Sequence, residues 1–321
     1  MRKIISKVMR ANITSIILAC AVIAVIFSLL AQGFSSRYNV INMAKAASLT
    51  IVIGLGQLAV LSVGQFNLAL GAMGCMAAMT YAWSIQMAGI SPLLAVLIAL
   101  AIGGALGFLQ GMMVTKTKLN PFVVTLALSS VYKGAATVLF KGQMLNDLPA
   151  SVKAINKTYL VGIPTLFVLS LGLVLVMQVF MNVTIYGRRL LATGESPRSA
   201  LISGLRPQRQ INIAHLLSGL LAASAAIIAV SRLGAAQLSV GNDWMLMSFA
   251  APVLGGTMLS GGRVSPIGTI FGAILLNMIS YGLVMMNVNL YWSQTFMGVI
   301  LVASFAVNYL RQRMALKGGR G

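Results

Sequence analysis

A run of 70 residues without one charged side chain, from residue 46 to residue 115, limits what this chain can fold into. Soluble domains carry about 25% charged residues, whereas only 8% of this chain is charged. A membrane-spanning helix needs about 20 apolar residues, so the run predicts three consecutive spans. The lipid bilayer is therefore the expected solvent for most of the chain.

Further apolar runs extend the same pattern along the sequence. They predict one span each in residues 11–36, 119–141, 160–187, 210–231 and 233–262, and two spans in residues 264–310. The total is ten helices. Residues 244–258 are short and carry glycines, so a re-entrant hairpin there, with eight or nine full spans, is the alternative. The sequence predicts an all-α polytopic membrane protein that forms one transmembrane domain over residues 1–321.

The basic residues orient these spans. With both termini in the cytoplasm, sixteen lysines and arginines fall on the cytoplasmic side and six on the outside, as the positive-inside rule requires. Helices two to five and seven to ten then differ by five crossings, so the two halves are expected to be inverted repeats. The basic residues lie between apolar runs and not among aromatics, which indicates contact with membrane lipids and excludes nucleic acid.

The longest polar segment on the predicted cytoplasmic side is "YGRRLLATGESPRSALISGLRPQRQ", residues 186–210. Ser196 is a good N-cap, Pro197 fits the first helical position, and Gly204 can end a helix in a left-handed turn. Between them, Ala200 and Leu201 offer a small apolar contact face. The segment predicts a short helix outside the membrane, and the alternative is a plain connector with basic anchors.

The polar inventory argues against an enzyme. The chain has three acidic residues and one histidine, which leaves little for acid–base chemistry. It contains no G-x-x-x-x-G-K-[ST] phosphate-binding loop, and no group of residues has metal-ligand spacing. No cofactor or metal is expected, and energy for any transport must come from another polypeptide.

Polar side chains inside the spans are the predicted translocation path, because such groups are costly when they face lipid. Neutral donors and acceptors suit a polyhydroxylated solute better than an ion. The alternative for each is to join neighbouring helices, and Lys133 has the further alternative of reaching the membrane surface. The predicted path residues are Gln57, Gln65, Asn67, Ser129, Ser130, Tyr132, Lys133, Asn277, Ser280 and Tyr281.

Three stretches resemble a known family: residues 120–143, residues 186–205 and, most specifically, "APVLGGTMLSGGRVSPIGTIFGAILLNMISYGLVMMNVN", residues 251–289. They are similar to the permease subunits of bacterial ATP-binding-cassette importers of the ribose and monosaccharide type. The resemblance implies a multi-pass protein of the inner membrane, ATPase subunits, a second permease copy or paralogue, and a periplasmic or lipid-anchored solute-binding protein. It also implies that the stretch matching residues 186–205 is the coupling helix that docks on the ATPase. The implied coupling residues are Ser196, Pro197, Arg198, Ala200, Leu201 and Gly204.

The solute is the least determined part of this interpretation. Sugar permeases of this type usually carry an aspartate where this chain has Asn67, and the preceding "GQ" leans towards the related branched-chain amino-acid permeases. A monosaccharide is the first expectation and a branched-chain amino acid the alternative. A secondary transporter is a further alternative, but none of the three acids is predicted at mid-membrane.

Overall fold

The computed structural model describes residues 2–117 and 119–288, together with residues 292, 295, 298, 299 and 302, and describes side chains from residue 14 onward. Its helices are α1 (Arg2–Leu30), α2 (Arg37–Leu61), α3 (Leu70–Gln86), α4 (Pro92–Thr117), α5 (Pro121–Leu139), α6 (Ala150–Ala154), α7 (Thr165–Val183), α8 (Ile185–Glu195), α9 (Pro197–Ile202), α10 (Pro207–Leu233), α11 (Trp244–Leu254) and α12 (Pro266–Met285). A short antiparallel hairpin of β1 (Tyr159–Leu160) and β2 (Ile163–Pro164) joins α6 to α7.

Among the described residues, six helices are long and apolar enough to cross a membrane: α2, α4, α5, α7, α10 and α12. Shorter apolar helices are residues 14–30 of α1 and the whole of α11. In the run from 46 to 115, where three spans are predicted, α2 and α4 are long and apolar enough to cross a membrane, and the third helix, α3, has 17 residues. The second span expected in residues 264–310 lies mainly outside the described residues. The prediction of an all-α polytopic membrane protein is confirmed, and the count of ten spans stays a prediction.

No single continuous helix fills residues 233–262, where one span is expected. Helix α10 ends at Leu233, residues 234–243 are not helical, and α11 has only 11 residues. At 1.5 Å per residue, α11 is about 16 Å long, roughly half of the ~30 Å hydrocarbon core. Gly234 ends α10 with a left-handed φ of 71°, and four of the next nine residues are Gly, Ser, Asn or Asp. These residues favour turns over a helix. The apolar run at 233–262 is long enough for a full span, but its helix, α11, has only about half that length.

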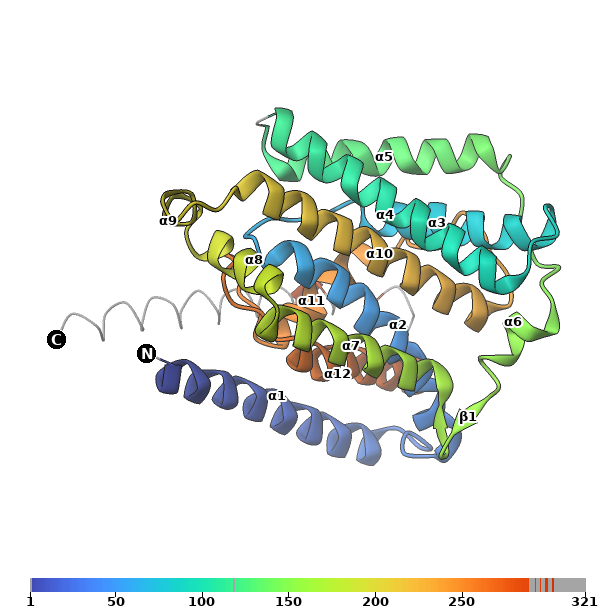
Figure 1. The fold of residues 1–321 in the computed structure, drawn as a ribbon. Coiled ribbons are helices and arrows are strands. Elements are labelled where there is room, and N and C mark those ends of the chain that lie inside the picture. The colour runs from blue at the N-terminus through green and yellow to red at the C-terminus, as the bar shows by residue number, and fades with distance from the viewer. Residues whose placement is uncertain are drawn as a thin grey trace.

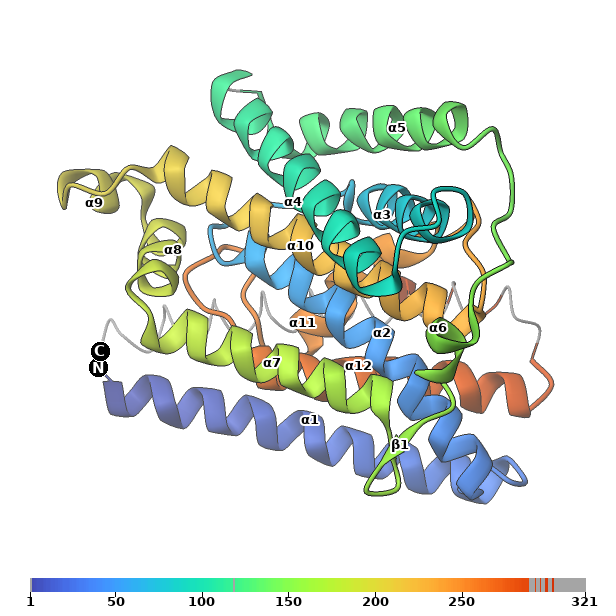
Figure 2. The same ribbon diagram turned by 45° about the vertical axis from the view of Figure 1, so that its right-hand side comes forward.

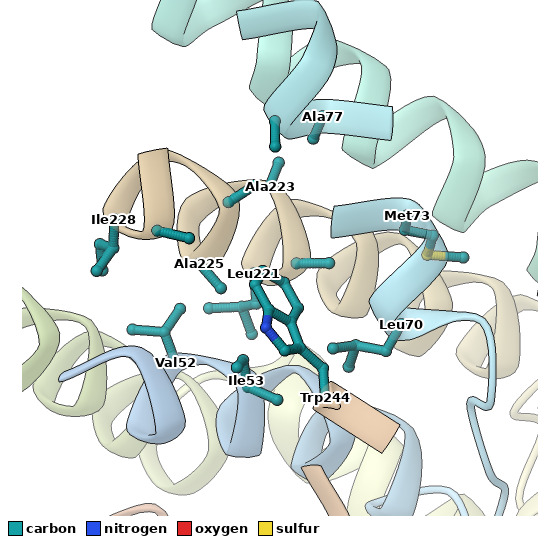
Figure 3. Close-up of a cluster of buried hydrophobic side chains, with 14 of the residues drawn as sticks. Val52, Ile53, Leu70, Met73, Ala77, Leu221, Ala223, Ala225, Ile228 and Trp244 are labelled. Atoms are coloured by element: carbon teal, nitrogen blue, oxygen red, sulfur yellow. The ribbon is translucent and has the colours of Figure 1, made fainter. Parts of the chain in front are cut away.

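Helices α2 and α10 lie in the middle of the bundle and α1, α5 and α7 at its margins (Figures 1 and 2). Most of the apolar window of α2 and of α10 is buried, whereas less than a third of that of α4, α5 and α7 is buried. In the core, the Trp244 indole of α11 lies close to Leu221 of α10, Leu70 of α3 and Ile53 of α2 (Figure 3). The outer helices present their leucines and valines where lipid replaces water as the solvent.

Helices α4 and α10 cross in close contact. A Cβ atom at Gly219 would overlap the carbonyl oxygen of Gly103 and lie 2.9 Å from the Cα atom of Gly107. The small-residue spacing of "GGALGFLQG" predicts such a contact. Beside it, the Gln110 amide and the Nδ1 atom of His215 are 3.0 Å apart, and both side chains are buried. The lone histidine of the chain thus joins two helices.

The two ends of the bundle carry different elements. Helices α8 and α9 project from the same end as the start of α1, whereas the β1–β2 hairpin and α6 lie at the opposite end (Figures 1 and 2). At the hairpin end, Asn156 donates to the Arg232 carbonyl oxygen (3.2 Å) and Arg232 donates to the Tyr281 hydroxyl (3.3 Å). These bonds join the ends of α10 and α12 to the segment that precedes the hairpin.

Candidate coupling helix and solute cavity

Helix α9 is capped at both ends by its own sequence. The Ser196 hydroxyl accepts from the N–H of Ser199 at 3.2 Å, and Pro197 occupies the first helical turn. Gly204 takes a left-handed φ of 78°, its N–H donates to the Leu201 carbonyl oxygen, and the Leu205 N–H donates to that of Ala200, both at 3.0 Å. This pair of bonds is a Schellman motif. The expected helix boundaries are confirmed.

The expected contact face of α9 needs a correction. Ala200 is buried, with 4% of its surface exposed, so it packs inside the chain and cannot be a docking residue. Leu201 is 62% exposed and the neighbouring Ile202 81% exposed. The outward apolar surface of α9 is therefore Leu201 and Ile202, flanked by the exposed Arg198. Spacing alone missed Ile202, because a six-residue helix does not reveal which side faces its neighbours.

A cavity of about 500 Å³ lies beside α5. One wall is α5, with Ser129, Ser130 and Lys133. The opposite wall is non-helical backbone together with the first residues of two short helices. These residues are Leu68, Gly71 and Ala72 at the start of α3, and Gly241, Asn242 and Met245 at the start of α11. Irregular backbone at membrane depth is tolerated where it lines a cavity or is buried in protein. The cavity therefore accounts for the non-helical residues before α3 and before α11.

Lys133 joins the two walls. Its ammonium group donates to the Leu238 carbonyl oxygen and, at 2.6 Å, to the Oδ1 atom of Asn242. The Cys75 thiol of α3 also donates to the Leu238 carbonyl oxygen, at 3.4 Å. Lys133 therefore holds the 238–242 segment against α5 at the cavity and does not reach out to the membrane surface.

Three other predicted path residues lie near the cavity but do not line it. With its amide oriented so that both ends are satisfied, Gln57 donates to the Asn67 carbonyl oxygen (2.9 Å) and accepts from the Asn67 N–H (3.2 Å). The Asn67 amide donates to the Ser218 hydroxyl of α10 at 2.8 Å. The Oε1 atom of Gln65 is buried and has no hydrogen-bond partner within the described part of the chain. Gln57 and Asn67 fix the residues between α2 and α3.

Asn277, Tyr281 and Tyr132, which are also predicted path residues, join helices elsewhere. Asn277 donates to the Thr50 hydroxyl at 3.0 Å and so connects α12 to α2. The Tyr281 hydroxyl donates to the Asn42 carbonyl oxygen at 3.3 Å, and that of Tyr132 to the Leu106 carbonyl oxygen at 3.1 Å. For these three side chains the structure favours the helix-joining alternative.

The described residues contain no group of three or more His, Cys, Asp and Glu side chains arranged to hold a metal ion. The six long apolar helices contain none of the three acidic residues of the chain, which are Asp147, Glu195 and Asp243. The polar cavity residues that sequence reasoning missed are Thr137 and Asn242. The signal for Asn242 is the polar turn "SVGND", residues 239–243, set within an apolar run.

Known transport proteins match this chain along most of its length. A family model described as "Branched-chain amino acid transport system / permease component" matches residues 39–305. The ribose import permease protein of Bacillus subtilis (strain 168) is 31% identical over 283 residues, which cover 88% of each chain. The D-allose transport system permease protein of Escherichia coli (strain K12) is 28% identical over 298 residues, 90% of this chain and 89% of that one. The autoinducer 2 import system permease protein of Yersinia pestis (strain Pestoides F) is 28% identical over 286 residues, 89% of this chain and 81% of that one. No solved structure matches the chain.

Proposed function

Because this chain belongs to the permease-component family of branched-chain amino-acid transport systems, we propose that it carries a monosaccharide across the bacterial inner membrane in an ATP-binding-cassette importer. The chain is a multi-pass inner-membrane transport protein and not an enzyme. The similarity to import permeases over about nine tenths of the chain carries this conclusion.

The proposed solute is a neutral polyhydroxylated sugar. The relatives described above are named for ribose and D-allose. The polar side-chain groups of the cavity are the hydroxyls of Ser129, Ser130 and Thr137, the Asn242 amide and the Lys133 ammonium. Hydroxyls, amides and ammonium groups offer the hydrogen bonds that sugar hydroxyls need, and a small set of such groups in a concave site gives orientation and specificity.

The proposed site for ATPase docking is the outward surface of α9, Leu201 and Ile202. Both side chains are exposed on a helix that projects from one end of the bundle (Figure 1). Burying an exposed Leu or Ile side chain contributes about 1.5–3 kcal/mol, so the pair contributes enough to seat a partner with modest additional contacts. Ser196, Pro197 and Gly204 then act by fixing the helix, and Arg198 lies at its polar edge.

The proposed assembly contains two permease chains, this one twice or together with a paralogue, two ATPase subunits, and a solute-binding protein on the outer side. The proposed topology has ten crossings with both termini in the cytoplasm, and α8 and α9 lie on that side. The half-length α11 and the non-helical residues 234–243 together form one of these crossings. Discontinuous helices of this kind are typical of transporter binding regions near the membrane midplane.

A branched-chain amino acid is the second candidate solute, because the matching family is described by that transport system. An amino acid presents a carboxylate, which Lys133 would bind, and an ammonium group, which needs an acceptor. No carboxylate is among the described residues that line the cavity, and the Oδ1 atom of Asn242 already accepts a bond from Lys133. A monosaccharide needs no such acceptor for a charge, so the cavity favours the sugar.

The two solutes are separated by uptake in cells. The chain is expressed with the ATPase and the solute-binding protein of its importer, in a strain that lacks its own ribose and leucine importers. Labelled ribose or allose is expected to accumulate, and leucine is expected neither to accumulate nor to compete. Accumulation of leucine without that of any monosaccharide would show that the solute is an amino acid.

A further inference from the structure

Three stretches that are far apart in the sequence meet through their backbones at the end of α8. We name this contact the glycine junction: residues 62–64 after α2, residues 194–195 at the end of α8, and residues 260–262 between α11 and α12. The Gly262 N–H donates to the Ser62 carbonyl oxygen at 3.1 Å. A Cβ atom at Gly194 would overlap that same carbonyl oxygen and lie 2.6 Å from the Gly262 nitrogen. Only glycine allows the three backbones to approach this closely.

The closest approaches at the glycine junction are between backbone atoms, which have no rotamers that could absorb a movement. A Cβ atom at Gly261 would lie 2.6 Å from the Gly64 nitrogen and 2.8 Å from the Gly194 carbonyl oxygen. Close-packed protein has low compressibility and transmits strain. Glu195, the last residue of α8, is followed directly by Ser196, the N-cap of α9. A shift of α9 therefore reaches the end of α2 through direct backbone contact.

Residues 62–69 begin in the glycine junction and form a firmly held connector between α2 and α3. The Asn67 amide donates to Ser218 of α10 at 2.8 Å, and its Oδ1 atom accepts from the Ala69 N–H at 2.9 Å. The Leu68 N–H donates to the Thr125 hydroxyl of α5 at 3.3 Å. Asn67 is completely buried. The connector is irregular in backbone but fixed by hydrogen bonds along its length.

The far end of the connector is a wall of the cavity. Leu68 lines it, and Gly71 and Ala72 of the first turn of α3 continue the same wall. Thr125, which bonds the connector, lies one turn before Ser129 of the opposite wall. The connector thus touches the coupling segment at one end and both cavity walls at the other.

We infer that the connector, residues 62–69, transmits movement of α8 and α9 through the glycine junction to the wall of the solute cavity. Gly194 and Gly262 are positioning residues in this account, since they touch neither solute nor ATPase. The inference rests on the proposed function, because it assumes that an ATPase moves α9. Coupling between distant sites travels through packed elements with more than one arrangement, and the connector is the element that both sites contact.

The test measures movement of the cavity wall separately from ATPase binding. The parent is the chain with Cys20→Ala, Cys75→Ser and Ser130→Cys, which leaves one thiol at the cavity. The permease is reconstituted with its ATPase in nanodiscs. Maleimide labelling is timed without nucleotide and after trapping with ATP and vanadate. The labelling rate of the parent is expected to change several-fold between the two states.

Gly194→Ala and Asn67→Ala are expected to keep the bound ATPase but to lose the nucleotide-dependent change in labelling. Gly172→Ala is the matched control, because a Cβ atom there meets nothing within 4 Å, and it is expected to behave like the parent. Should Gly194→Ala fail to reach the membrane, Asn67→Ala decides, since it removes atoms and adds none. A full nucleotide-dependent change in the decisive variant would overturn the inference, as would a parent whose labelling ignores nucleotide. A parent that binds no ATPase would instead contradict the proposed function.

Discussion

Lys133 of α5 donates to the Oδ1 atom of Asn242 at 2.6 Å and so joins the two walls of the cavity. The same ammonium group donates to the Leu238 carbonyl oxygen. A hydrogen bond to a charged group contributes about 1.5–3 kcal/mol. One lysine therefore determines how closely the 238–242 segment lies against α5.

Lys133→Met is expected to reduce solute uptake by about tenfold or more, because it removes both bonds and keeps the apolar stem. Uptake at equal membrane levels of the protein is the measurement. Lys116→Met is the control, since it removes the same charge from an exposed position at the end of α4. Unchanged uptake in Lys133→Met would show that the cavity is not on the solute path.

Leu201→Asp is expected to abolish uptake and to release the ATPase on pull-down, while the protein remains inserted. An unpaired charge buried in an apolar contact costs several kcal/mol, more than the exposed pair Leu201 and Ile202 contributes. Ile202→Asp is expected to act in the same way. Arg189→Gln, on α8, is the control and is expected to have a much smaller effect. Normal uptake in both aspartate variants would mean that α9 is only a connector.

Gly219→Ala is expected to destabilise the fold by about 1–3 kcal/mol, the usual cost of overpacking. Its Cβ atom would overlap the Gly103 carbonyl oxygen and force α4 and α10 apart. The midpoint of thermal unfolding in detergent, followed by fluorescence-detected size exclusion, measures the change. Gly172→Ala places the same methyl group in open space on α7 and is expected to leave the midpoint unchanged or slightly higher. Equal midpoints for the two variants would contradict the crossing geometry.

The proposed topology is tested with reporter fusions. A reporter inserted at Val161, the 94%-exposed residue between β1 and β2, is expected on the outer side of the inner membrane, opposite to the cytoplasm. A reporter fused after Gly321 is expected in the cytoplasm. The physical reason is the excess of lysine and arginine on the predicted cytoplasmic side. Two reporters on the same side would exclude the ten-crossing arrangement.

Sequence reasoning predicted the features of this fold that depend on local or regular patterns. Apolar run lengths predicted most of the helices, because spans follow bilayer thickness. The caps of α9 were predictable from Ser196, Pro197 and Gly204, because capping depends on a few adjacent residues. The close crossing of α4 and α10 was predictable from glycine spacing on α4.

The features that depend on which side of a helix faces inward were not predictable. Ala200 and Ile202 have opposite exposure although they lie two residues apart on one short helix. Asn67 and Ser129 are both polar residues in apolar surroundings, but one bonds α10 and the other lines the cavity. Residues 234–243 contain enough apolar side chains for a span, and only their turn-forming residues show that the helix is interrupted.

The most direct test of the central claim is sugar uptake by proteoliposomes that contain this chain, its ATPase and its solute-binding protein. With ATP on the ATPase side, labelled ribose or allose is expected to enter against its gradient. Leaving out ATP or the ATPase is expected to reduce entry to background, and the purified chain alone is expected to hydrolyse no ATP. Uptake that persists without the ATPase, or ATP hydrolysis by this chain alone, would contradict the account.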